Sequence, residues 1–304
     1  MECFDICFII LHFLDAEMTS ICVNSIIESF SDCKFFIEIV DNGSANNSNE
    51  VLMSKYSVYN NIHISINEKN LGFANGNNTG YIWAKSNLKF KFLCVLNNDI
   101  VINQKNIFDV LCSEYNNFNF SVLGPDIISD VNGSHQNPYI EKGFSLKELE
   151  KYKSVLYRRR KFYFLYYHFD EIKKKLRLLR KNNKKENINS NVYLRHSLNP
   201  VLHGACYFFS SKFFESRELL FNPNTFMYFE ENILHYECVK NSLNMIYSPC
   251  ICVRHCEDVS TKVFIRNNYK REKWILNECI KSVEIFLELM NNDVKNGIVV
   301  FDYE

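Results

Sequence analysis

The chain has 304 residues, 47% of them apolar, and its 35 basic residues balance its 35 acidic ones. This length provides a sizeable core in one large domain or two modest ones, and the balanced charge by itself indicates no partner. The length excludes a small disulfide-stapled protein, and many of the twelve cysteines lie in apolar runs, so we expect reduced core cysteines in a cytosolic chain. The first fifteen residues contain acids and only a short apolar run, which predicts neither a signal peptide nor a membrane span.

Strands and helices alternate in the first hundred residues. Apolar runs predict strands, and apolar residues recurring every three or four positions predict helices. In chain order we expect a strand at 5–13, a helix at 19–30, a strand at 35–41, a helix at 49–57, a strand at 61–68, a helix at 73–86 and a strand at 90–102. This alternation indicates an α/β fold with a mostly parallel sheet covered on both faces.

Polar clusters follow three of the predicted strands. They are Asp41–Ser44, Asn70–Gly72 and Asn97–Asp99. In sheets of this kind ligands bind at the carboxyl ends of the strands. We therefore expect the three clusters to meet along one rim.

A basic segment interrupts this pattern. From Lys142 to Lys185 there are sixteen basic residues against four acidic ones, and aromatic residues concentrate at 162–169. The polar stretch 181–191 that follows is expected to be mobile. The globular pattern resumes after Asn199, with a strand leading into a helix at 201–214, a strand at 245–255 in which Pro249 marks a kink or an edge, and a long helix at 268–290.

Several residues at the predicted rim are candidates for chemistry. Asp99 ends a buried strand, where it can hold a divalent cation that neutralises a diphosphate, or simply form an Asx turn. Asp41 ends another strand and can accept hydrogen bonds from a nucleobase. The glycine- and asparagine-rich stretch 70–81 matches neither a dinucleotide fingerprint nor a P-loop, and it can also be a plain helix-capping loop.

Two adjacent carboxylates, Glu230 and Glu231, follow the aromatic run 226–229. Apolar residues continue at helical spacing over 233–238, which places the pair in the first turn of a helix, where the helix dipole stabilises negative charge. One glutamate can then act as a general base while the other anchors a substrate hydroxyl against an aromatic wall. An ordinary acidic helix start is the alternative.

His255 lies just beyond a strand, a place where a lone histidine is more often structural than a ligand. Lys262, in the loop that follows, can meet a phosphate. Together with His255, the cysteines at 250–256 raise the possibility of zinc. Their spacing matches no paired C-x-x-C pattern, and Cys250 and Cys252 would share one face of a strand, so the sequence does not favour zinc there.

Taken in this order, these stretches resemble the family-two inverting glycosyltransferases of the GT-A fold. Within that family the resemblance is to bacterial enzymes that build capsule, O-antigen or other cell-surface polysaccharides, including rhamnosyltransferase-like members. The segments that carry it are FIILHF, TSICVNSI, VDNGSANNS, NLGFANGNNTGY, LNNDIVI, HGACYFFSSKFF, FMYFEENIL and HCEDVSTK. Each is weakly diagnostic, but eight in the right order are specific, and they cover about residues 6–130 and 199–262.

The resemblance implies a GT-A Rossmann-like fold with a helical basic insertion. It divides the chain into a nucleotide-sugar-binding half at 1–140, the basic aromatic insertion at 141–198, an acceptor and catalytic half at 199–265, and a C-terminal helical segment at 266–304. It also implies transfer of a sugar from a nucleotide-diphosphate donor to a saccharide acceptor.

The family pattern assigns roles at the matching positions. Asp41 would contact the donor base, and Asn70, Gly72 and Asn78 would border the nucleotide. Asn97, Asn98 and Asp99 stand where the family has its D-x-D motif, so the two asparagines would border the donor and Asp99 would bind Mg²⁺ or Mn²⁺. His255 would be a further ligand of that metal.

Glu231 stands where many members have the aspartate of a Glu-Asp motif, which implies that it is the base that deprotonates the acceptor. Glu230 would support it or bind the acceptor. The sequence departs from the pattern at three places: Asn97 replaces the first acid of D-x-D, Glu-Glu replaces Glu-Asp, and Pro223 stands where an acid is common. The second departure leaves open which glutamate is the base.

Two alternatives remain beside this interpretation. A non-catalytic, membrane-associated scaffold or sugar-binding protein would keep the fold, but the presence of Asp99, Glu231 and His255 argues against it. A nucleotidyltransferase would need a basic glycine-rich loop after the first strand, and the sequence has none there.

The basic aromatic segment predicts a location as well. Its cations are expected to dock the protein on the anionic inner face of the cell membrane, as a peripheral cytoplasmic enzyme with a lipid-linked acceptor. A solvated helical hairpin is the alternative for this segment. Nucleic acid is not an expected partner, because the rest of the chain offers no motif for reading it.

Overall fold

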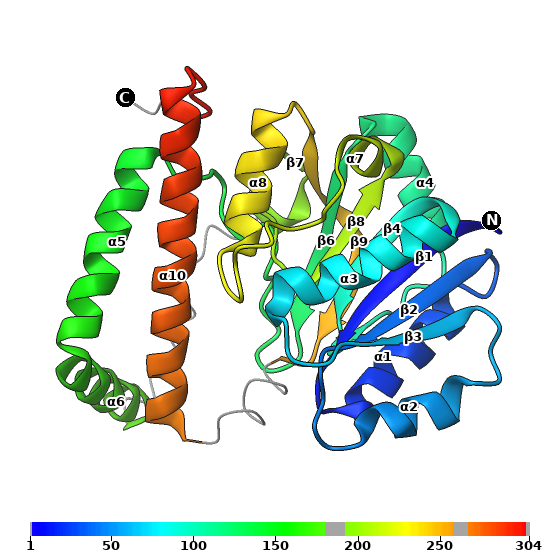
Figure 1. The fold of residues 1–304 in the computed structure, drawn as a ribbon, viewed down its shortest axis with the longest axis horizontal. Helices are drawn as coiled ribbons and strands as arrows, with labels where there is room; N and C mark the ends of the chain where they lie inside the picture. The colour runs from blue at the N-terminus through cyan, green and yellow to red at the C-terminus, as the bar shows by residue number, and fades with distance from the viewer. Residues whose placement is uncertain (1, 180–191, 258–266, 302–304) are drawn as a thin grey trace.

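The computed structural model describes residues 2–179, 192–257 and 267–301, and it confirms the predicted α/β class. In the described chain one nine-stranded sheet has the order β3-β2-β1-β4-β8-β6-β9-β5, with β7 paired to β9 (Figure 1). Strands β1, β2, β3, β4, β6 and β9 run in one direction and β5, β7 and β8 in the other. The sheet is therefore mostly parallel, as predicted. The strands are β1 (Cys3–His12), β2 (Phe35–Asp41), β3 (Ile62–Ile66), β4 (Lys89–Asn97), β5 (Ile100–Val101), β6 (Val122–Ser129), β7 (Ser197–Leu198), β8 (Cys206–Ser210) and β9 (Met245–His255).

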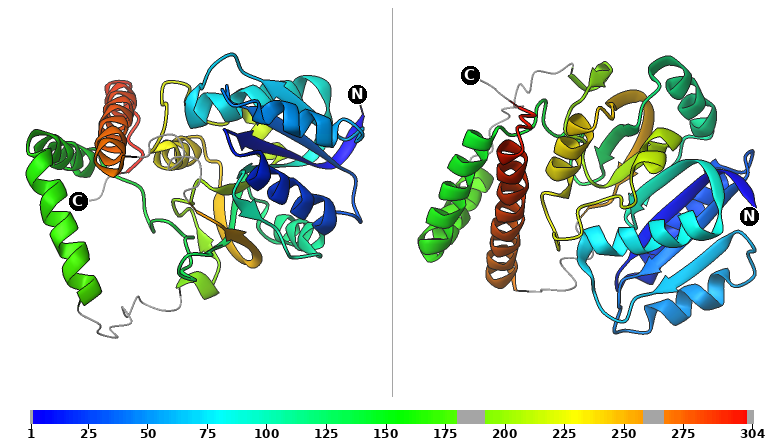
Figure 2. Two further views of the ribbon diagram at one scale, coloured as in Figure 1. Left: turned by 90° about the horizontal axis from the view of Figure 1, so that it is seen from below. Right: turned by 45° about the horizontal axis from the view of Figure 1, so that its top comes forward.

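Helices cover both faces of the sheet (Figures 1 and 2). Along β1, Phe8 and Ile10 pack on the face covered by α1, α2 and α4, while Cys7 and Ile9 face α3, α7 and α8. Such a strand is apolar on both sides, which explains its continuous apolar run. The helices are α1 (Ala16–Ser29), α2 (Ser48–Tyr56), α3 (Gly72–Asn87), α4 (Ile107–Phe118), α5 (Leu146–Lys161), α6 (Tyr163–Leu179), the 3₁₀ turn η1 (Val192–Leu194), α7 (Ser211–Ser216), α8 (Glu230–Lys240) and α10 (Asn268–Lys295).

Helices α5, α6 and α10 stand beside the sheet (Figures 1 and 2). The first of them begins at a capping box, in which Ser145 accepts from the Glu148 backbone and Glu148 accepts from the Ser145 backbone. The three helices share an apolar cluster with one face of α8. The expected basic insertion thus contains two helices, of which α5 packs along the C-terminal helix α10 and α6 turns away from the line of α5 (Figure 2).

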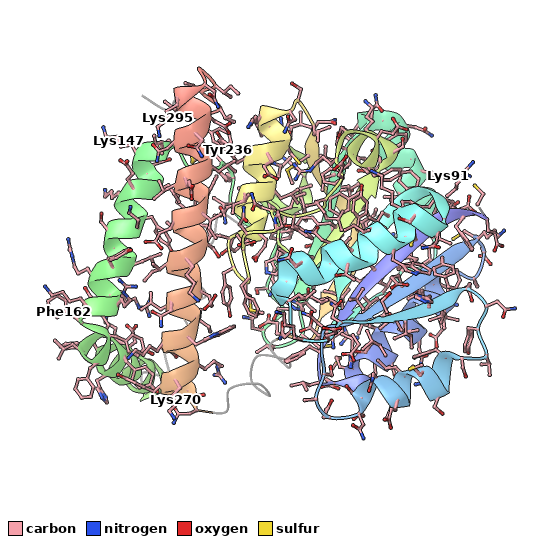
Figure 3. The ribbon with its side chains drawn as sticks, in the orientation of Figure 1. Lys91, Lys147, Phe162, Tyr236, Lys270 and Lys295 are labelled. Carbon is pink, nitrogen blue, oxygen red and sulfur yellow. The ribbon has the colours of Figure 1, made fainter. Side chains whose placement is uncertain are left out.

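Helix α8 lies between this helical unit and the sheet. Its Leu234 and Cys238 belong to the core on the sheet, and its Ile233 and Tyr236 belong to the cluster shared with α10. The Tyr236 hydroxyl, labelled in Figure 3, donates to Asp293 of α10 at 2.9 Å. Two packed faces therefore fix the helix that begins with the two glutamates.

Strand β9 contains the irregularity predicted at Pro249. Its pairing with β6 moves from Pro125↔Ser248 to Asp126↔Cys252, so the intervening residues bulge out of the ladder. Gln104 stabilises the bulge by donating to the Cys250 carbonyl at 3.1 Å and accepting from the Cys252 amide at 3.0 Å.

Among the described residues no helix combines the length and the apolar character needed to cross a membrane. Two predictions, the mobile stretch at 181–191 and the phosphate contact of Lys262, fall outside the described residues.

Candidate active site

A cavity of about 390 Å³ opens at the carboxyl ends of β1, β4 and β9. Two other cavities, of about 360 and 400 Å³, lie against α5 and its neighbours, so volume does not single out the site. The first cavity is distinguished because polar groups from distant segments converge on it. Its polar lining consists of Asn42, Asn70, Asn97, Asn98, Asp99, His203, Glu230, Glu231 and His255.

The end of β2 is organised by Asn42, which is almost fully buried. Its amide nitrogen donates to Asn70 Oδ1 at 3.1 Å and to the Gly72 carbonyl at 3.0 Å, while its oxygen accepts from the Leu71 amide at 3.0 Å. These bonds join the loop after β2 to the loop before α3. Asn70 and Gly72 thereby reach the same rim as Asn97–Asp99, as the positions of the strand ends predict.

Gly72 makes a close backbone contact possible. It has φ +79°, and a Cβ atom on it would lie 2.1 Å from the Phe226 carbonyl oxygen. The following amide, of Phe73, donates to that same oxygen at 2.7 Å. Only glycine fits here without a shift, because both the positive φ and the space exclude a side chain. The contact ties the start of α3 to the segment that leads into α8.

At the end of β4, Asn98 is anchored from behind. Its amide nitrogen donates to Thr19 Oγ1 at 3.0 Å. The Thr19 hydroxyl itself donates to the Asp15 carbonyl and lies 2.7 Å from His12 Nδ1. This buried chain fixes the turn that presents Asp99 to the cavity.

The tautomer of His255 follows from its partners. Gln136 Nε2 donates to Glu257 Oε1 at 2.9 Å, so Gln136 Oε1 faces His255 Nδ1 at 2.7 Å. In the neutral ring Nδ1 then carries the proton, and the Nε2 lone pair points to Asp99 Oδ1 at 3.3 Å.

Two acceptors that face each other are stabilised by a cation between them. A histidine that donates its second ring nitrogen to a carbonyl oxygen is the usual arrangement of a metal ligand. Asp99 Oδ1 takes no hydrogen bond from the described residues. Asp99 and His255 therefore fit the predicted divalent-metal site, with Gln136 and Glu257 orienting the ring.

Glu230 and Glu231 begin α8, as predicted. The two residues before them, Tyr228 and Phe229, have φ of 72° and 70°, a conformation that costs aromatic residues about 1–2 kcal/mol each. Phe229 packs against Phe144 and Tyr152, with ring centroids 6.1 and 5.7 Å away. Packing therefore holds a strained turn that brings both carboxylates to the cavity.

The two carboxylates differ in environment. Glu230 is buried, and burial together with the adjacent Glu231 raises its pKa to about 8, although hydrogen bonds from Thr225 and the Tyr228 backbone oppose the increase. Burial also raises the pKa of Glu231, which is the more exposed of the two. Because two adjacent charges repel, the pair takes up a proton readily, and the more buried Glu230 is the one that keeps it.

Aromatic side chains form the wall opposite the strand ends. Phe226 and Tyr228 each lie 6.3 Å from the Trp274 ring, between centroids, and Tyr139 lines the same cavity. Trp274 comes from α10, far along the chain. Rings in such an arrangement can cover the apolar face of a sugar, so this side of the cavity suits an acceptor.

Two of the predicted donor residues do not line the cavity. Asp41 is buried behind it: its Oδ1 accepts from the Ser44 amide at 3.1 Å, and its Oδ2 has no hydrogen-bond partner among the described residues. Asn78 donates to the Phe221 carbonyl and accepts from the Leu220 and Phe221 amides. Neither residue reaches the cavity: Asp41 Oδ2 is buried, and the Asn78 side chain holds the backbone of residues 220 and 221.

Four residues of the site were not predicted from the sequence: Asn42, Gln136, His203 and Trp274. Asn42 lies inside a motif that was recognised, so its position was a usable signal. His203 lies beside His255, with ring centroids 5.8 Å apart, and burial, together with repulsion from His255 whenever that ring is protonated, lowers the pKa of His203 to about 4. Nothing in the local sequence around Gln136 or Trp274 marks either one.

The chain is similar to proteins of a known enzyme family. The sequence matches the family described as Glycosyl transferase family 2 over residues 7–220. A search of curated proteins finds no match. The crystal structure of S. aureus TarS is similar, with a TM-score of 0.53 and 12% identity over 83% of this chain and 37% of that one. TarS 1–349 in complex with UDP gives a TM-score of 0.53 and 13% identity, covering 84% of this chain and 61% of that one.

TarS 1–349 in complex with UDP-GlcNAc gives a TM-score of 0.52 and 12% identity, covering 84% of this chain and 59% of that one. This chain thus spans 37% of the TarS chain, and at these identities the likeness shows the fold alone. Glu230, Glu231, His255 and Trp274 lie beyond the part that matches the family. The family match covers well over half of the sequence, and the protein belongs to glycosyl transferase family 2, with a GT-A Rossmann-like fold.

Proposed function

We propose that the protein transfers a sugar from a nucleoside-diphosphate sugar to a hydroxyl group of a saccharide. The observation that carries the proposal is one cavity with a candidate metal pair, Asp99 and His255, and a carboxylate pair, Glu230 and Glu231. Such a cavity can hold a charged leaving group and a proton acceptor at the same time. Family membership supports sugar transfer, and TarS shows that a protein of this fold binds UDP and UDP-GlcNAc.

The donor occupies the rim in this proposal. Asn70, Gly72, Asn97 and Asn98 border the nucleotide and its diphosphate, and Asp41 would meet the base once a shift of the loop after β2 uncovers its buried Oδ2. Asp99 and His255 would hold Mg²⁺ or Mn²⁺, which when bound neutralises charge on the leaving diphosphate.

The chemical step needs one proton acceptor. The acceptor hydroxyl attacks the anomeric carbon while its proton passes to Glu231. The new C–O bond forms as the bond to the diphosphate breaks, and the electron pair leaves with the diphosphate. A single displacement of this kind inverts the anomeric configuration.

Glu231 suits the base better than Glu230. A base must be ionised before it accepts a proton, and Glu230 has a pKa of about 8, so it is mostly protonated at neutral pH. A protonated Glu230 can instead donate a hydrogen bond to the acceptor or to Glu231. Two adjacent glutamates suit this role because Glu230 holds a proton, so that Glu231 can stay charged.

Turnover of nucleotide sugars tests the proposal. Glu231→Gln should lower kcat by about 10²-fold or more and leave donor affinity unchanged, whereas Asp99→Ala should abolish metal-dependent donor binding. Near-wild-type turnover by the Glu231 variant would refute the base. Donor affinity unaffected by EDTA would refute the metal. Donor binding without transfer or donor hydrolysis would favour the sugar-binding scaffold.

We also propose that helices α5 and α6 dock on an anionic membrane, where a lipid-linked acceptor for a capsule or O-antigen type of polysaccharide would be presented. Tyr163 and Tyr167 face inward, each 4.9 Å from the Tyr269 ring between centroids. On the outer side of α6, Phe164 is 62% and Phe169 61% exposed. A helix that is apolar on its outward face has a surface that remains to be covered.

The charge next to this surface indicates what covers it. Arg158, Arg159, Arg160 and Lys161 form the last turn of α5, and exposed Phe162 follows at the outer edge of the molecule (Figure 3). Each cation near an anionic membrane surface contributes up to about 1 kcal/mol to the free energy of membrane binding. Cations beside outward aromatic rings suit a headgroup boundary.

Sedimentation with vesicles tests the docking. The protein should pellet with phosphatidylglycerol vesicles at low salt, stay in solution with phosphatidylcholine, and be released as salt rises. Changing the four basic residues to Gln, or both Phe164 and Phe169 to Ser, should weaken the binding. A wild-type protein that remains in the supernatant with anionic vesicles would show that helices α5 and α6 have a different role.

A further inference from the structure

Three side chains capable of binding a metal meet outside the cavity described above. They are Glu114 of α4, His196 just before β7, and Cys250 in the bulge of β9. His196 Nε2 lies 2.8 Å from Glu114 Oε2 and 4.0 Å from Cys250 Sγ, and the three ligating atoms all lie within 4.8 Å of one another. In the described part of the chain this is the only group of three or more His, Cys, Asp or Glu side chains that meets this limit.

The fold builds this cluster from irregular backbone. Strand β7 pairs with β9 in the register Ser197↔Tyr247, so His196 comes next to Ser248 at the edge of the bulge. The bulge leaves Cys250 exposed instead of placing it in the ladder, and Gln104 fixes the two backbone groups that flank it. Bulges are a common means of re-aiming a side chain.

The third ligand, Glu114, comes from α4, which packs against β9. Glu114 is only 5% exposed, although it carries a carboxylate. Its partner is His196, whose ring also packs on Phe118 with centroids 4.8 Å apart. A buried carboxylate is costly unless a positive charge compensates it, and an exposed imidazole supplies such a charge only when it is protonated.

We propose that Glu114, His196 and Cys250 form a zinc site. The set of one thiolate, one imidazole and one carboxylate suits zinc, whereas the soft thiolate makes it a poor set for the hard ions Mg²⁺ and Mn²⁺. Ligand atoms around tetrahedral zinc lie about 3.3–3.7 Å apart, between the two separations observed. For zinc to bind, the Cys250 thiol loses its proton, and the proton that His196 Nε2 shares with Glu114 leaves or moves to Nδ1, so that Nε2 and the carboxylate are free to ligate; water then completes the tetrahedron.

The site differs from the proposed donor metal site in place and in chemistry. It would connect three elements: α4, strand β9, and the segment at His196 that returns from the basic insertion. Its role would be to hold that returning segment against the sheet, so it does not depend on the glycosyltransfer proposal. From the sequence, zinc was considered for Cys250, Cys252 and Cys256 with His255 and was not favoured. The structure instead joins Cys250 to His196 and Glu114, which lie 54 and 136 positions away.

Cobalt is the probe, because a thiolate ligand gives tetrahedral Co²⁺ an intense charge-transfer band in the near ultraviolet. The untagged full-length protein is stripped with EDTA and titrated in an Asp99→Ala background, which removes the other candidate site. We expect one cobalt ion per chain with this band and its displacement by zinc. Cys250→Ser should abolish the band, and Cys256→Ser, the matched control at a partly buried cysteine near the donor site, should retain it.

Thermal stability gives a second measurement. Zinc should raise the Tm of the Asp99→Ala protein by several degrees and leave the Tm of the double variant with Cys250→Ser unchanged, while Mg²⁺ should move neither. The proposal is overturned if no charge-transfer band forms, if the band survives Cys250→Ser, or if zinc stabilises both proteins equally. Turnover of nucleotide sugars is a separate assay, so failure of one proposal leaves the other standing.

Discussion

Replacing Glu230 with Gln should make the folded protein more stable in alkaline solution. Glu230 is 4% exposed, lies beside Glu231, and has a pKa of about 8 instead of 4.5. Its Oε1 has no hydrogen-bond partner among the described residues. The folded protein thus prefers this side chain protonated, and glutamine has nearly the shape of the protonated acid without its ability to ionise.

The sign of the effect follows from the direction of the shift. A group whose pKa is raised by folding contributes stability that is complete below its unfolded pKa, here 4.5. That contribution is lost as the pH rises toward the folded pKa of about 8. At about 1.4 kcal/mol for each pKa unit, the loss is about 1 kcal/mol at pH 5 and about 4 kcal/mol at pH 8. The Gln variant does not suffer this loss, so its advantage grows over the same range.

Thermal unfolding of both proteins between pH 5 and pH 8 tests this reasoning. At about 2 °C for each kcal/mol in a chain of this size, the variant should gain roughly 8 °C over the wild type at pH 8 and little at pH 5. A matched control is Glu148→Gln, because hydrogen bonds with Ser145 lower the pKa of Glu148. That change should lower stability at neutral pH, and its cost should fade in acid.

The same unfolding measurements on Glu231→Gln test how strongly Glu230 and Glu231 influence each other. Glu231→Gln removes the neighbouring charge, so the pKa of Glu230 should fall and the pH dependence should weaken without disappearing. A difference between wild type and Glu230→Gln that stays constant from pH 5 to pH 8 would refute the raised pKa. The choice of Glu231 as the base would then lose its main support.

Three other changes examine different parts of the site. Gln136→Leu removes the acceptor that fixes the His255 tautomer, so Mn²⁺ affinity measured by electron paramagnetic resonance should fall about 10–100-fold; unchanged affinity would separate Gln136 from the metal site. Gly72→Ala places a methyl group 2.1 Å from the Phe226 oxygen at φ +79° and should cost more than about 2 kcal/mol in denaturant unfolding. Gly133→Ala, at φ +70° with open space around it, should cost only about 1 kcal/mol, and equal losses would mean that the close contact contributes nothing. Trp274→Ala should raise the KM for acceptor and leave donor affinity unchanged, and a weaker donor affinity would place the ring on the donor side.

The sheet could be predicted because its signals are local. An apolar run such as residues 5–13 reports burial on two faces, and each polar cluster marks the end of its own strand. Because ligands bind at the carboxyl ends of parallel strands, Asn70–Gly72 and Asn97–Asp99 could be predicted to lie on one rim before any contact between them was known. The strand order, with β8 inserted antiparallel between β4 and β6, depends on pairings between residues 85 or more positions apart, and no local pattern encodes them.

The remaining residues of the site depend on contacts between distant segments. Gln136 becomes important only because β6 and β9 pair and bring His255 to its side. Trp274 reaches the cavity because α10 packs on α8. The apolar pattern of α10 predicts a helix but not the helix on which it packs. Asn78 is the opposite case: it lies in a recognisable motif but outside the cavity, where its side chain bonds to the backbone of Leu220 and Phe221.

The position of α8 explains how the chain holds two adjacent acids in an aromatic setting. The helix is fixed by the sheet on one face and by α10 on the other, so the strained turn at Tyr228 and Phe229 is compensated by packing on two sides. The same turn is tied to the proposed donor rim, because the Phe226 carbonyl accepts from the Phe73 amide beside Gly72. A change at Gly72 should therefore disturb not only the donor loop but also the pair at the start of α8. The donor rim and the carboxylates are connected through three residues of backbone, and this is the structural reason to expect that filling one side of the cavity affects the geometry of the other.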